Sequence, residues 1–261
     1  MDLPLSRAVL PALEWRERCA STNTELVSRA AQLDDLAVLA TDDQHAGKGR
    51  LDRTWSARPG ESLAVSVFVA LPAGVAPDPR RLGWLPLVAG LAVVRAVRTL
   101  GVARAGLKWP NDVLVSRANG DRKLCGVLTE LTSHGVVIGA GLNLAQSEST
   151  LPVPTATSLA LEGVEPPRRS VDAVLAAVLA ELVPLVGEWR ASTDPGALRA
   201  EIEAAMHTIG RAVRVDLPGR PPVLGAASGL DDDGRLLVQP AEVGAALIAV
   251  AAGDVTHLRY E

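Results

Sequence analysis

The chain has 261 residues, with 26 basic and 30 acidic side chains, a formal net charge of −4 and a pI near 5.7. This length suffices for one large domain, or for one large and one small domain. The acidic balance and the lack of any long basic block argue against bulk attraction to nucleic acid. No amino-terminal signal peptide is apparent, and the uncharged run 62–77 is broken by Pro72 and Gly74, so no membrane span is expected.

The two cysteines, Cys19 and Cys125, fit a reducing compartment better than a disulfide framework, so we expect a cytoplasmic protein. Lysine is rare, because arginine supplies nearly all of the basic side chains. A lysine in such a chain is a candidate for a position that favours a compact ammonium over a guanidinium. Asparagine is equally rare, and most of these residues fall in the segments described next: Lys48, Lys108, Lys123, Asn23, Asn111 and Asn143.

The first expected elements are a short strand over Leu13 to Arg18 and a helix that begins in the sequence Ser21-Thr22-Asn23-Thr24-Glu25. We expect Thr22 to be the N-cap, with Glu25 completing a capping box. Capping by itself accounts for this segment. The hydroxyls and the amide of Ser21, Thr22 and Asn23 are also suitable partners for a polar ligand group at a helix start.

A loop over 41–55 follows an apolar strand, Leu36 to Ala40. Its glycines allow backbone amides to approach an anion closely, its arginines can form paired hydrogen bonds with phosphate or carboxylate, and its tryptophan offers a flat apolar face. These features suit an anionic ligand that carries a ring, although a solvated surface loop is the simpler alternative for Gly-x-Gly alone. The candidate residues are Gln44, Gly47, Lys48, Gly49, Arg50, Arg53 and Trp55.

A buried strand over Ser62 to Ala70 and a helix over Pro79 to Leu100 are expected core elements. The sequence Lys108-Trp109-Pro110-Asn111-Asp112 then precedes a strand over Val113 to Ser116. A lysine, an amide and a carboxylate this close together suit a nucleotide phosphate with its magnesium ion. An ordinary proline turn capped by Asp112 is the alternative.

A hairpin turn at 118–121 leads into a strand over Arg122 to Leu131, and a second turn at 133–135 leads into Val136 to Leu144. These strands carry Lys123 and Asn143. A lysine at the start of an apolar strand often only extends its ammonium to water, so a structural role for Lys123 remains open. The glycines Gly126, Gly139 and Gly141 predict bulges or places where a ligand lies against the sheet.

The last third of the chain changes from helical to β patterning. A helix is expected from Ser170, interrupted at Pro184, and another from Asp194-Pro195. Beyond Gly210, short apolar runs separated by turn residues predict a small all-β module. These runs are Ala212 to Leu217, Leu236 to Gln239, Ala246 to Ala251 and Val255 to Leu258. We therefore divide the chain into domains 1–208 and 209–261.

Five motifs in this order resemble those of the biotin protein ligases. They are Ser-Thr-Asn at 21–23, Gln44 with Gly-Lys-Gly-Arg at 47–50 and Trp55, Lys-Trp-Pro-Asn-Asp at 108–112, Lys-Leu-Cys-Gly at 123–126, and Gly-Ala-Gly-Leu-Asn at 139–143. The resemblance implies an α+β fold, in which a mixed β-sheet with packed helices, related to the class II aminoacyl-tRNA synthetase core, precedes a small C-terminal SH3-like β-barrel.

The resemblance also implies a two-step reaction. ATP activates biotin as biotinyl-5′-AMP, and a lysine of a biotin carboxyl carrier domain of an acyl-CoA carboxylase then accepts the biotinyl group. Because both steps develop negative charge on oxygen, positioned cations are the expected catalytic device. The implied partners are this carrier domain, biotin, ATP and Mg²⁺, with no nucleic acid and no membrane, in a monomer or weak homodimer.

Particular roles follow from the resemblance. Ser21, Thr22, Asn23 and Gln44 would hold the ureido head of biotin, and the loop from Gly47 to Arg50 would close over the ligand. The implied catalytic residues are Lys123, between the biotin carboxylate and the α-phosphate, with Arg50 and Lys108 on phosphates. Arg53 and Trp55 would contact the nucleotide, Asn111 and Gly126 would also line the binding site, and magnesium would be organised by Asp112 and Asn143.

The chain departs from the usual Gly-Arg-Gly-Arg-x-Gly-Arg loop of this family. Lys48 replaces the first arginine, and Asp52 replaces the third glycine. A carboxylate at Asp52 would weaken the hold on the adenylate. Some members of the family carry an amino-terminal helix-turn-helix; only about twenty residues precede the Ser-Thr-Asn helix here, which is too few for its three-helix form, so no DNA-binding role is expected.

Two alternative functions remain at this stage. A lipoate or octanoate transferase shares the ancestry of the catalytic core, but the phosphate loop and the Ser-Thr-Asn group would have no task on an apolar acyl tail. A non-catalytic module that binds biotin or a carrier domain through the β module is the second alternative. Biotin-dependent exchange of pyrophosphate into ATP separates these functions.

Overall fold

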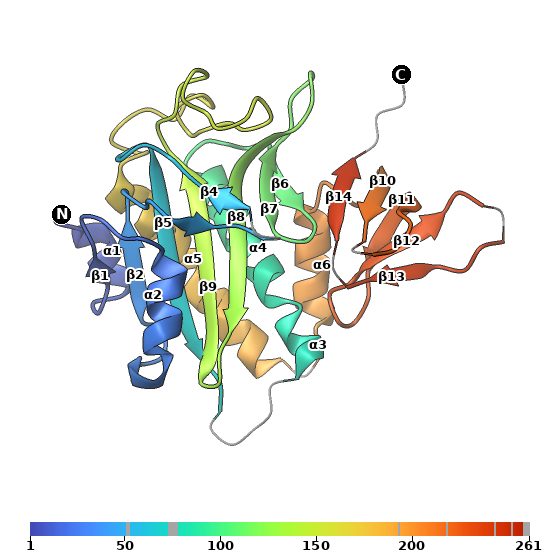
Figure 1. Ribbon diagram of the computed structural model, residues 1–261, viewed down its shortest axis with the longest axis horizontal. Coiled ribbons are helices and arrows are strands. Elements are labelled where there is room, and N and C mark those ends of the chain that lie inside the picture. Colours follow the sequence, from blue (N-terminus) through green and yellow to red (C-terminus); the bar gives the residue numbers. More distant parts are fainter. Residues whose placement is uncertain are drawn as a thin grey trace.

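A seven-stranded and a five-stranded β-sheet lie side by side in the protein, and a third, two-stranded sheet completes the β-structure of the described residues (Figure 1). The structure is a computed structural model, and it describes residues 1–50, 53–72, 78–192, 194–217, 219–242, 244–251 and 253–257. Leu51 and Asp52 lie outside the described residues, so the expectation for Asp52 is not addressed by the structure.

The larger sheet positions all five motifs. Three of them lie on or between its strands, and the other two follow its strands β1 and β2 along the chain. Its seven strands are ordered β1-β2-β5-β9-β8-β7-β6, with β1 parallel to β2 and the other pairs antiparallel, so the expected mixed sheet is confirmed. The strands are β1 (Glu14–Trp15), β2 (Val38–Thr41), β5 (Ser62–Ala70), β6 (Ala105–Lys108), β7 (Asp112–Val115), β8 (Arg122–Leu131) and β9 (Gly135–Asn143).

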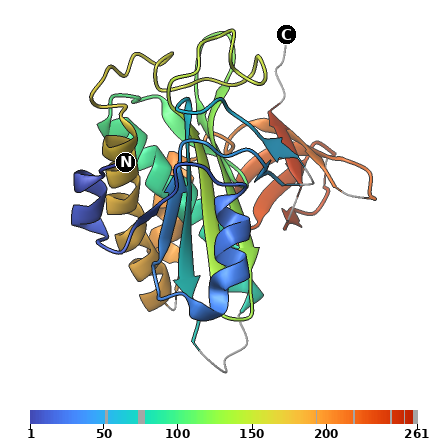
Figure 2. The ribbon, with the colours of Figure 1, turned by 60° about the vertical axis from the view of Figure 1, so that its left-hand side comes forward.

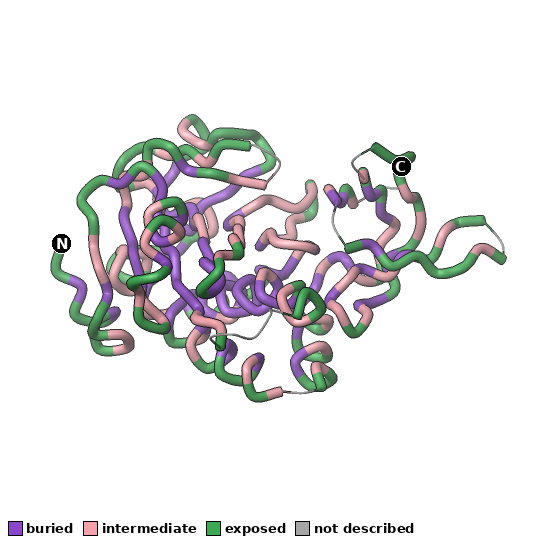
Figure 3. Tube along the Cα trace, turned by 60° about the horizontal axis from the view of Figure 1, so that its bottom comes forward, coloured by how far each residue is buried: buried purple, intermediate pink, exposed green. Residues whose placement is uncertain are grey.

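Helices cover both faces of this sheet, as Figure 2 shows from the side. The helix α2 (Thr22–Arg29), continued by a 3-10 turn η1 (Ala30–Gln32), packs on one face through Leu26, against Leu39 and Phe68. The opposite face is covered by α4 (Leu85–Thr99) and α5 (Val171–Ala191), with α1 (Pro4–Val9) against α5. The main hydrophobic core lies between the sheet and these helices, where buried residues concentrate in Figure 3.

The smaller sheet is antiparallel and is built from the last fifth of the chain, which confirms the expected all-β module. Its strand order is β13-β12-β11-β10-β14. The strands are β10 (Ala212–Asp216), β11 (Val223–Leu230), β12 (Leu236–Pro240), β13 (Ile248–Val250) and β14 (Asp254–His257). The sequence did not predict β11, because its glycines, alanines and serine lack the β-branched character of a typical strand.

Specific contacts join the two sheets. The helix α6 (Gly196–Ala205) leads into the smaller sheet, and the next residue, Met206, forms a bridge to Leu107 on β6. Trp109 is 2% exposed, and its indole Nε1 donates to the carbonyl of Gly234 at 3.1 Å. The Lys-Trp-Pro-Asn-Asp motif is therefore anchored where the larger sheet meets the smaller one. The expected proline turn is present in this motif, and its Trp109–Pro110 peptide bond is cis.

Two helix predictions were wrong in their boundaries. The expected helix over Pro79 to Leu100 is divided into α3 (Pro79–Leu82) and α4, and a Cβ at the intervening Gly83 would meet the carbonyl oxygen of Asp233 at 2.5 Å. The break therefore accommodates a turn of the smaller sheet. The helix α5, in contrast, continues through Pro184 without interruption. Burial of its face against α4 offsets the roughly 3 kcal/mol that an internal proline costs a helix.

The stretch Pro79–Thr99 has the length and mean hydropathy, 1.4, of a membrane-spanning helix, but 67% of its most apolar window is buried inside the protein. Such burial is typical of a core helix in a globular protein. The long apolar face of α4 is explained by its position under the larger sheet.

Candidate active site

A cluster of buried, uncharged polar side chains surrounds the start of α2. Ser21 is the N-cap, since its hydroxyl accepts from the Thr24 backbone N–H, so the prediction of Thr22 as N-cap was wrong by one residue. Glu25 does not complete a capping box but pairs with Arg16 at 3.0 Å. The hydroxyl of Thr22 is thereby free to face the sheet.

The cluster is held together by hydrogen bonds between segments far apart in the sequence. The Gln44 amide oxygen accepts from the Thr22 backbone N–H at 2.9 Å. The Ser66 hydroxyl lies 2.7 Å from Thr22 Oγ1 and 2.6 Å from Asn23 Oδ1. Asn23 Nδ2 donates to Glu130 Oε2 at 2.8 Å. We call Ser21, Thr22, Asn23, Gln44 and Ser66 the neutral half of the site.

Glycines on β9 make room for this cluster. A Cβ at Gly139 would lie 2.0 Å from Asn23 Oδ1, and a Cβ at Gly141 would lie 2.5 Å from the indole ring of Trp55. The register between β5 and β9 runs without a shift from residue 62 to 70, so neither glycine marks a bulge. In this structure the chain's own side chains occupy the space over these glycines, where we expected a ligand.

The loop over 41–55 forms a small hairpin beside the sheet. The strand β3 (Gly47–Lys48) pairs with β4 (Thr54–Trp55), and the Gly49 N–H donates to the Arg53 carbonyl at 2.7 Å. A Cβ at Gly47 would meet Gln44 Nε2 at 2.4 Å, so glycine is required there for close packing. Within the described residues, the buried Trp55 Nε1 has no hydrogen-bond partner, which leaves a donor for a ligand atom.

The cationic side chains lie next to the neutral half. The Lys123 ammonium is 2.7 Å from Asp112 Oδ1, and Arg50 Nη1 donates to Asn111 Oδ1 at 3.0 Å. Burial lowers the pKa of the Lys108 ammonium, and the nearby Asp112 carboxylate opposes this effect. We call Arg50, Arg53, Lys108, Asp112 and Lys123 the charged half of the site.

One cavity unites residues from all five motifs. It is lined by Ser21, Thr22, Asn23, Gln44, Lys48, Gly49, Arg50, Arg53, Trp55, Asn111, Asp112, Lys123 and Gly126 among the predicted site residues. Gly47 acts behind this lining, through its contacts with Gln44 and Trp55. Lys108 and Asn143 line an adjoining cavity, which also contacts Arg53, Trp55, Asp112 and Lys123.

The donors available to magnesium are few. The Asp112 carboxylate faces both cavities and fits a magnesium ion that arrives with phosphate oxygens. Asn143 fits less well, because its Nδ2 donates to the Thr157 carbonyl at 2.8 Å and its Oδ1 accepts from Gln146 at 2.9 Å. Among the described residues, no group of three or more His, Cys, Asp or Glu side chains is arranged to hold a metal ion.

Sequence reasoning missed three residues of the site. Ser66 and Glu130 hold Asn23, and Asp254 from the smaller sheet lines the cavity beside Arg53. Ser66 carried a weak signal, as a hydroxyl in an apolar strand. Nothing in the sequence near Asp254 indicates its position, because it reaches the site only through the packing of the two modules.

The geometry defines a cavity in which buried polar side chains adjoin a cluster of partly buried cations, as expected for an enzyme that joins a small acid to a nucleotide. Comparison with known proteins identifies the family. The profile described as "Biotin/lipoate A/B protein ligase family" matches residues 15–143, and that described as "Biotin protein ligase C terminal domain" matches residues 208–258.

Individual relatives agree with these profiles. The chain is 41% identical to a biotin–[acetyl-CoA-carboxylase] ligase from Mycobacterium tuberculosis over 94% of this chain and 90% of the relative. It is 30% identical to the bifunctional ligase/repressor BirA of Escherichia coli over 90% of this chain and 69% of BirA. The structure of an Aquifex aeolicus biotin protein ligase in complex with biotin and ATP matches with a TM-score of 0.74, 26% identity, and coverage of 95% of this chain and 99% of that one.

The chain belongs to the biotin protein ligase family. The resemblance that the five motifs indicated is thereby confirmed, as is the expected fold.

Proposed function

We propose that the protein activates biotin with ATP and transfers the biotinyl group to a lysine of the biotin carboxyl carrier domain of an acyl-CoA carboxylase. The observation that carries this proposal is the single cavity in which residues of all five motifs meet. The relative from M. tuberculosis is named for ligation of biotin to acetyl-CoA carboxylase, and the related Aquifex aeolicus structure holds both biotin and ATP.

In the first step, a biotin carboxylate oxygen forms a bond to the α-phosphorus of ATP, and pyrophosphate leaves. In the second, the acceptor lysine amine attacks the acyl carbon, AMP leaves, and the nitrogen loses a proton. We assign Lys123 to the oxygens that carry charge in both steps, because it lines the cavity and its ammonium is positioned there by the ion pair with Asp112. Arg50 and Lys108 are assigned to the phosphates, because Arg50 lines the same cavity as Asp112 and Lys108 interacts with the Asp112 carboxylate.

The neutral half is assigned to the ureido head of biotin. A ureido group presents both donors and acceptors, and a cluster of hydroxyls and amides satisfies both without a charge. Asp112 would hold a magnesium ion that accompanies ATP, and such an ion would supply neutralisation of the phosphate charge. The domain division at 208–209, the cytoplasmic location, the monomer or weak homodimer and the lack of a nucleic-acid partner remain predictions.

The test is exchange of labelled pyrophosphate into ATP, followed by transfer of biotin to a purified carrier domain. We expect exchange that requires biotin and is not supported by lipoate. Exchange that responds to lipoate instead would assign the protein to the neighbouring acyl-transfer class, and biotin binding without exchange would favour a non-catalytic module.

A further inference from the structure

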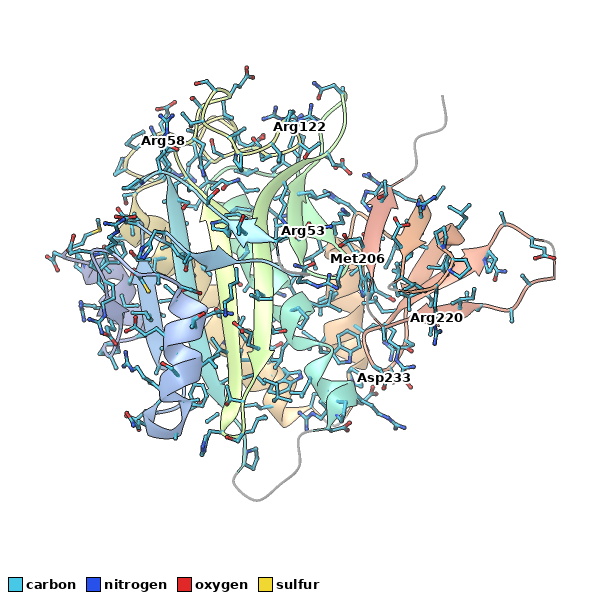
Figure 4. All side chains as sticks on the ribbon, viewed as in Figure 1. Arg53, Arg58, Arg122, Met206, Arg220 and Asp233 are labelled. Atoms are coloured by element: carbon cyan, nitrogen blue, oxygen red, sulfur yellow. The ribbon has the colours of Figure 1, made fainter. Side chains whose placement is uncertain are left out.

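A carboxylate from the C-terminal module enters the proposed nucleotide side of the site. Asp254, the first residue of β14, lines the same cavity as Arg53, Asp112 and Lys123. Its carboxylate forms an ion pair and hydrogen bond with the Arg53 guanidinium. Figure 4 shows Arg53 in the region between the larger sheet and β14. This contact connects the cation-rich loop with the smaller sheet.

The strand register places a second carboxylate next to Asp254, so Asp254 needs a cationic partner. On the antiparallel pair β10–β14, Asp254 lies directly opposite Asp216, and like charges in this arrangement repel each other. Asp216 has its own partner, since Arg214 lies 2.8 Å away on the same strand. Among the described residues, Arg53 is the only ion-pair partner of Asp254. The contact between the modules therefore compensates a repulsion that the smaller sheet itself creates.

The same guanidinium is suited to bind phosphate. Its donors form paired hydrogen bonds equally well with carboxylate or phosphate oxygens. The Arg53 side chain is 65% exposed and that of Asp254 is 34% exposed, so an incoming anion can reach the pair. The Asp254 carboxylate therefore occupies, in the free protein, the guanidinium donors of Arg53 that a nucleotide phosphate would use.

We propose that Asp254 competes with the nucleotide phosphates for Arg53, so that the C-terminal module sets the affinity of the site for MgATP. This inference rests on the proposed function. The nucleotide must displace Asp254 from Arg53, and the displaced carboxylate then repels the phosphates. Asp254 thereby weakens nucleotide binding and favours release of the phosphate-bearing products.

The test compares Asp254→Asn with Asp216→Asn, which removes the opposite carboxylate of the same strand pair and leaves Arg53 untouched. Because exposed ion pairs are weak, we expect Asp254→Asn to lower the KM and the Kd for MgATP about two- to fivefold. The KM for biotin should stay unchanged, and the difference should shrink at high salt. Asp254→Glu should restore most of the wild-type KM. Thermal melting of each variant checks the fold.

An Arg53→Gln background separates competition from a general loss of negative charge. If Asp254 acts mainly through Arg53, Asp254→Asn should change the Kd for MgATP much less in that background than in the wild type. A KM and Kd for MgATP that stay the same or rise in Asp254→Asn would overturn the inference, as would an equal effect of Asp216→Asn. Calorimetric titration with MgATP needs no turnover, so it tests the inference even if biotin-dependent exchange, and with it the proposed function, fails.

Discussion

The two halves of the site are built in different ways. In the neutral half, Ser21, Thr22, Asn23 and Ser66 are at most 5% exposed. The Ser66 hydroxyl bonds to Thr22 and Asn23, and the Ser21 hydroxyl accepts from the Thr24 backbone N–H. In the charged half, Lys123 keeps 36% and Arg53 65% of its side chain exposed, and both are held by ion pairs. Buried hydrogen bonds fix geometry and are costly to break, whereas exposed ion pairs are weak and exchange easily.

This difference corresponds to the two tasks proposed for the site. An uncharged head group requires a rigid set of donors and acceptors that is present before the ligand arrives. Phosphates are attracted to positive side chains over a longer distance. Lys123 and Arg53 can exchange their partners in the free protein, Asp112 and Asp254, for phosphate oxygens. The neutral half should therefore control stability and biotin binding, and the charged half should control rate and nucleotide binding.

The largest expected effect concerns Lys123→Arg. The Lys123 ammonium lies over Gly126, which has no side chain, and 2.7 Å from Asp112 Oδ1, so a wider, planar guanidinium would have to shift from this position. We expect adenylation to slow by roughly 10² to 10³, equivalent to about 3 to 4 kcal/mol, with little change in melting temperature or biotin affinity. Single-turnover adenylation and thermal melting measure both.

The matched control is Lys48→Arg, because Lys48 is an exposed lysine at the loop position where the family usually has arginine. It should stay within a few-fold of wild type. If Lys123→Arg also stays within threefold, Lys123 only extends to water from the end of β8. Early melting of Lys123→Arg would instead show that Lys123 is structural.

The second prediction concerns the junction that supports the charged half. Burial lowers the pKa of His257 to about 4, against the opposing effect of Asp121, whose Oδ2 lies 3.2 Å from His257 Nδ1. Arg211 lies 3.1 Å from the same ring nitrogen. Below the ordinary His pKa of roughly 6.5 the unfolded chain takes up a proton that the folded chain does not, so stability falls as the pH decreases toward 4.

We expect a loss of at most about 3 kcal/mol across this window, and no loss from this group above pH 7. Urea unfolding at pH 7 and pH 4 measures it. His257→Gln should flatten the profile, while His134→Gln, at an exposed turn, should not. The remaining slope is assigned to His207, whose pKa burial also lowers. An unchanged slope in His257→Gln would show that this histidine does not govern the junction.

The third prediction tests the rigidity of the neutral half. Asn23→Ala removes the side-chain amide that bonds to the Ser66 hydroxyl and to the Leu128 carbonyl, and Ser66 is fully buried. We expect a loss of about 1 to 3 kcal/mol in the free energy of unfolding, together with weaker biotin binding that high salt does not alter. Urea unfolding and titration with biotin measure the two effects. Ser28→Ala, on the same helix but outside the cluster, should change neither by more than a few tenths of a kcal/mol.

The smallest effect is a contrast between two alanines on one strand. Gly139→Ala drives a methyl group into Asn23, and Gly141→Ala drives one into the indole of Trp55. We expect Gly139→Ala to destabilise the fold by about 1 kcal/mol more, because Asn23 is buried and fixed whereas Trp55 is half-exposed on the small hairpin. Thermal melting measures both losses, and equal losses would show that Trp55 is held as firmly as Asn23 of the neutral half.

Much of this architecture was predictable from the sequence. Most strands of the larger sheet and the all-β module were indicated by apolar periodicity and turn residues, and the family by the order of five motifs. Local patterns carry this information because helices and strands bury one face at a fixed period. The break at Gly83 and the continuity of α5 through Pro184 were missed, because packing against distant segments decided both.

The sequence alone determined which residues are available for chemistry: the rare lysines, the Ser-Thr-Asn helix start and the Gly-Lys-Gly-Arg loop. Only the tertiary structure decided which of them meet, and what holds them. Ser66 and Glu130 fix Asn23 across three elements, and Asp254 reaches Arg53 over 201 positions in the chain. Such contacts leave no local pattern, because a side chain's partner across a folded interface depends on the register and packing of entire sheets rather than on its neighbours in the chain.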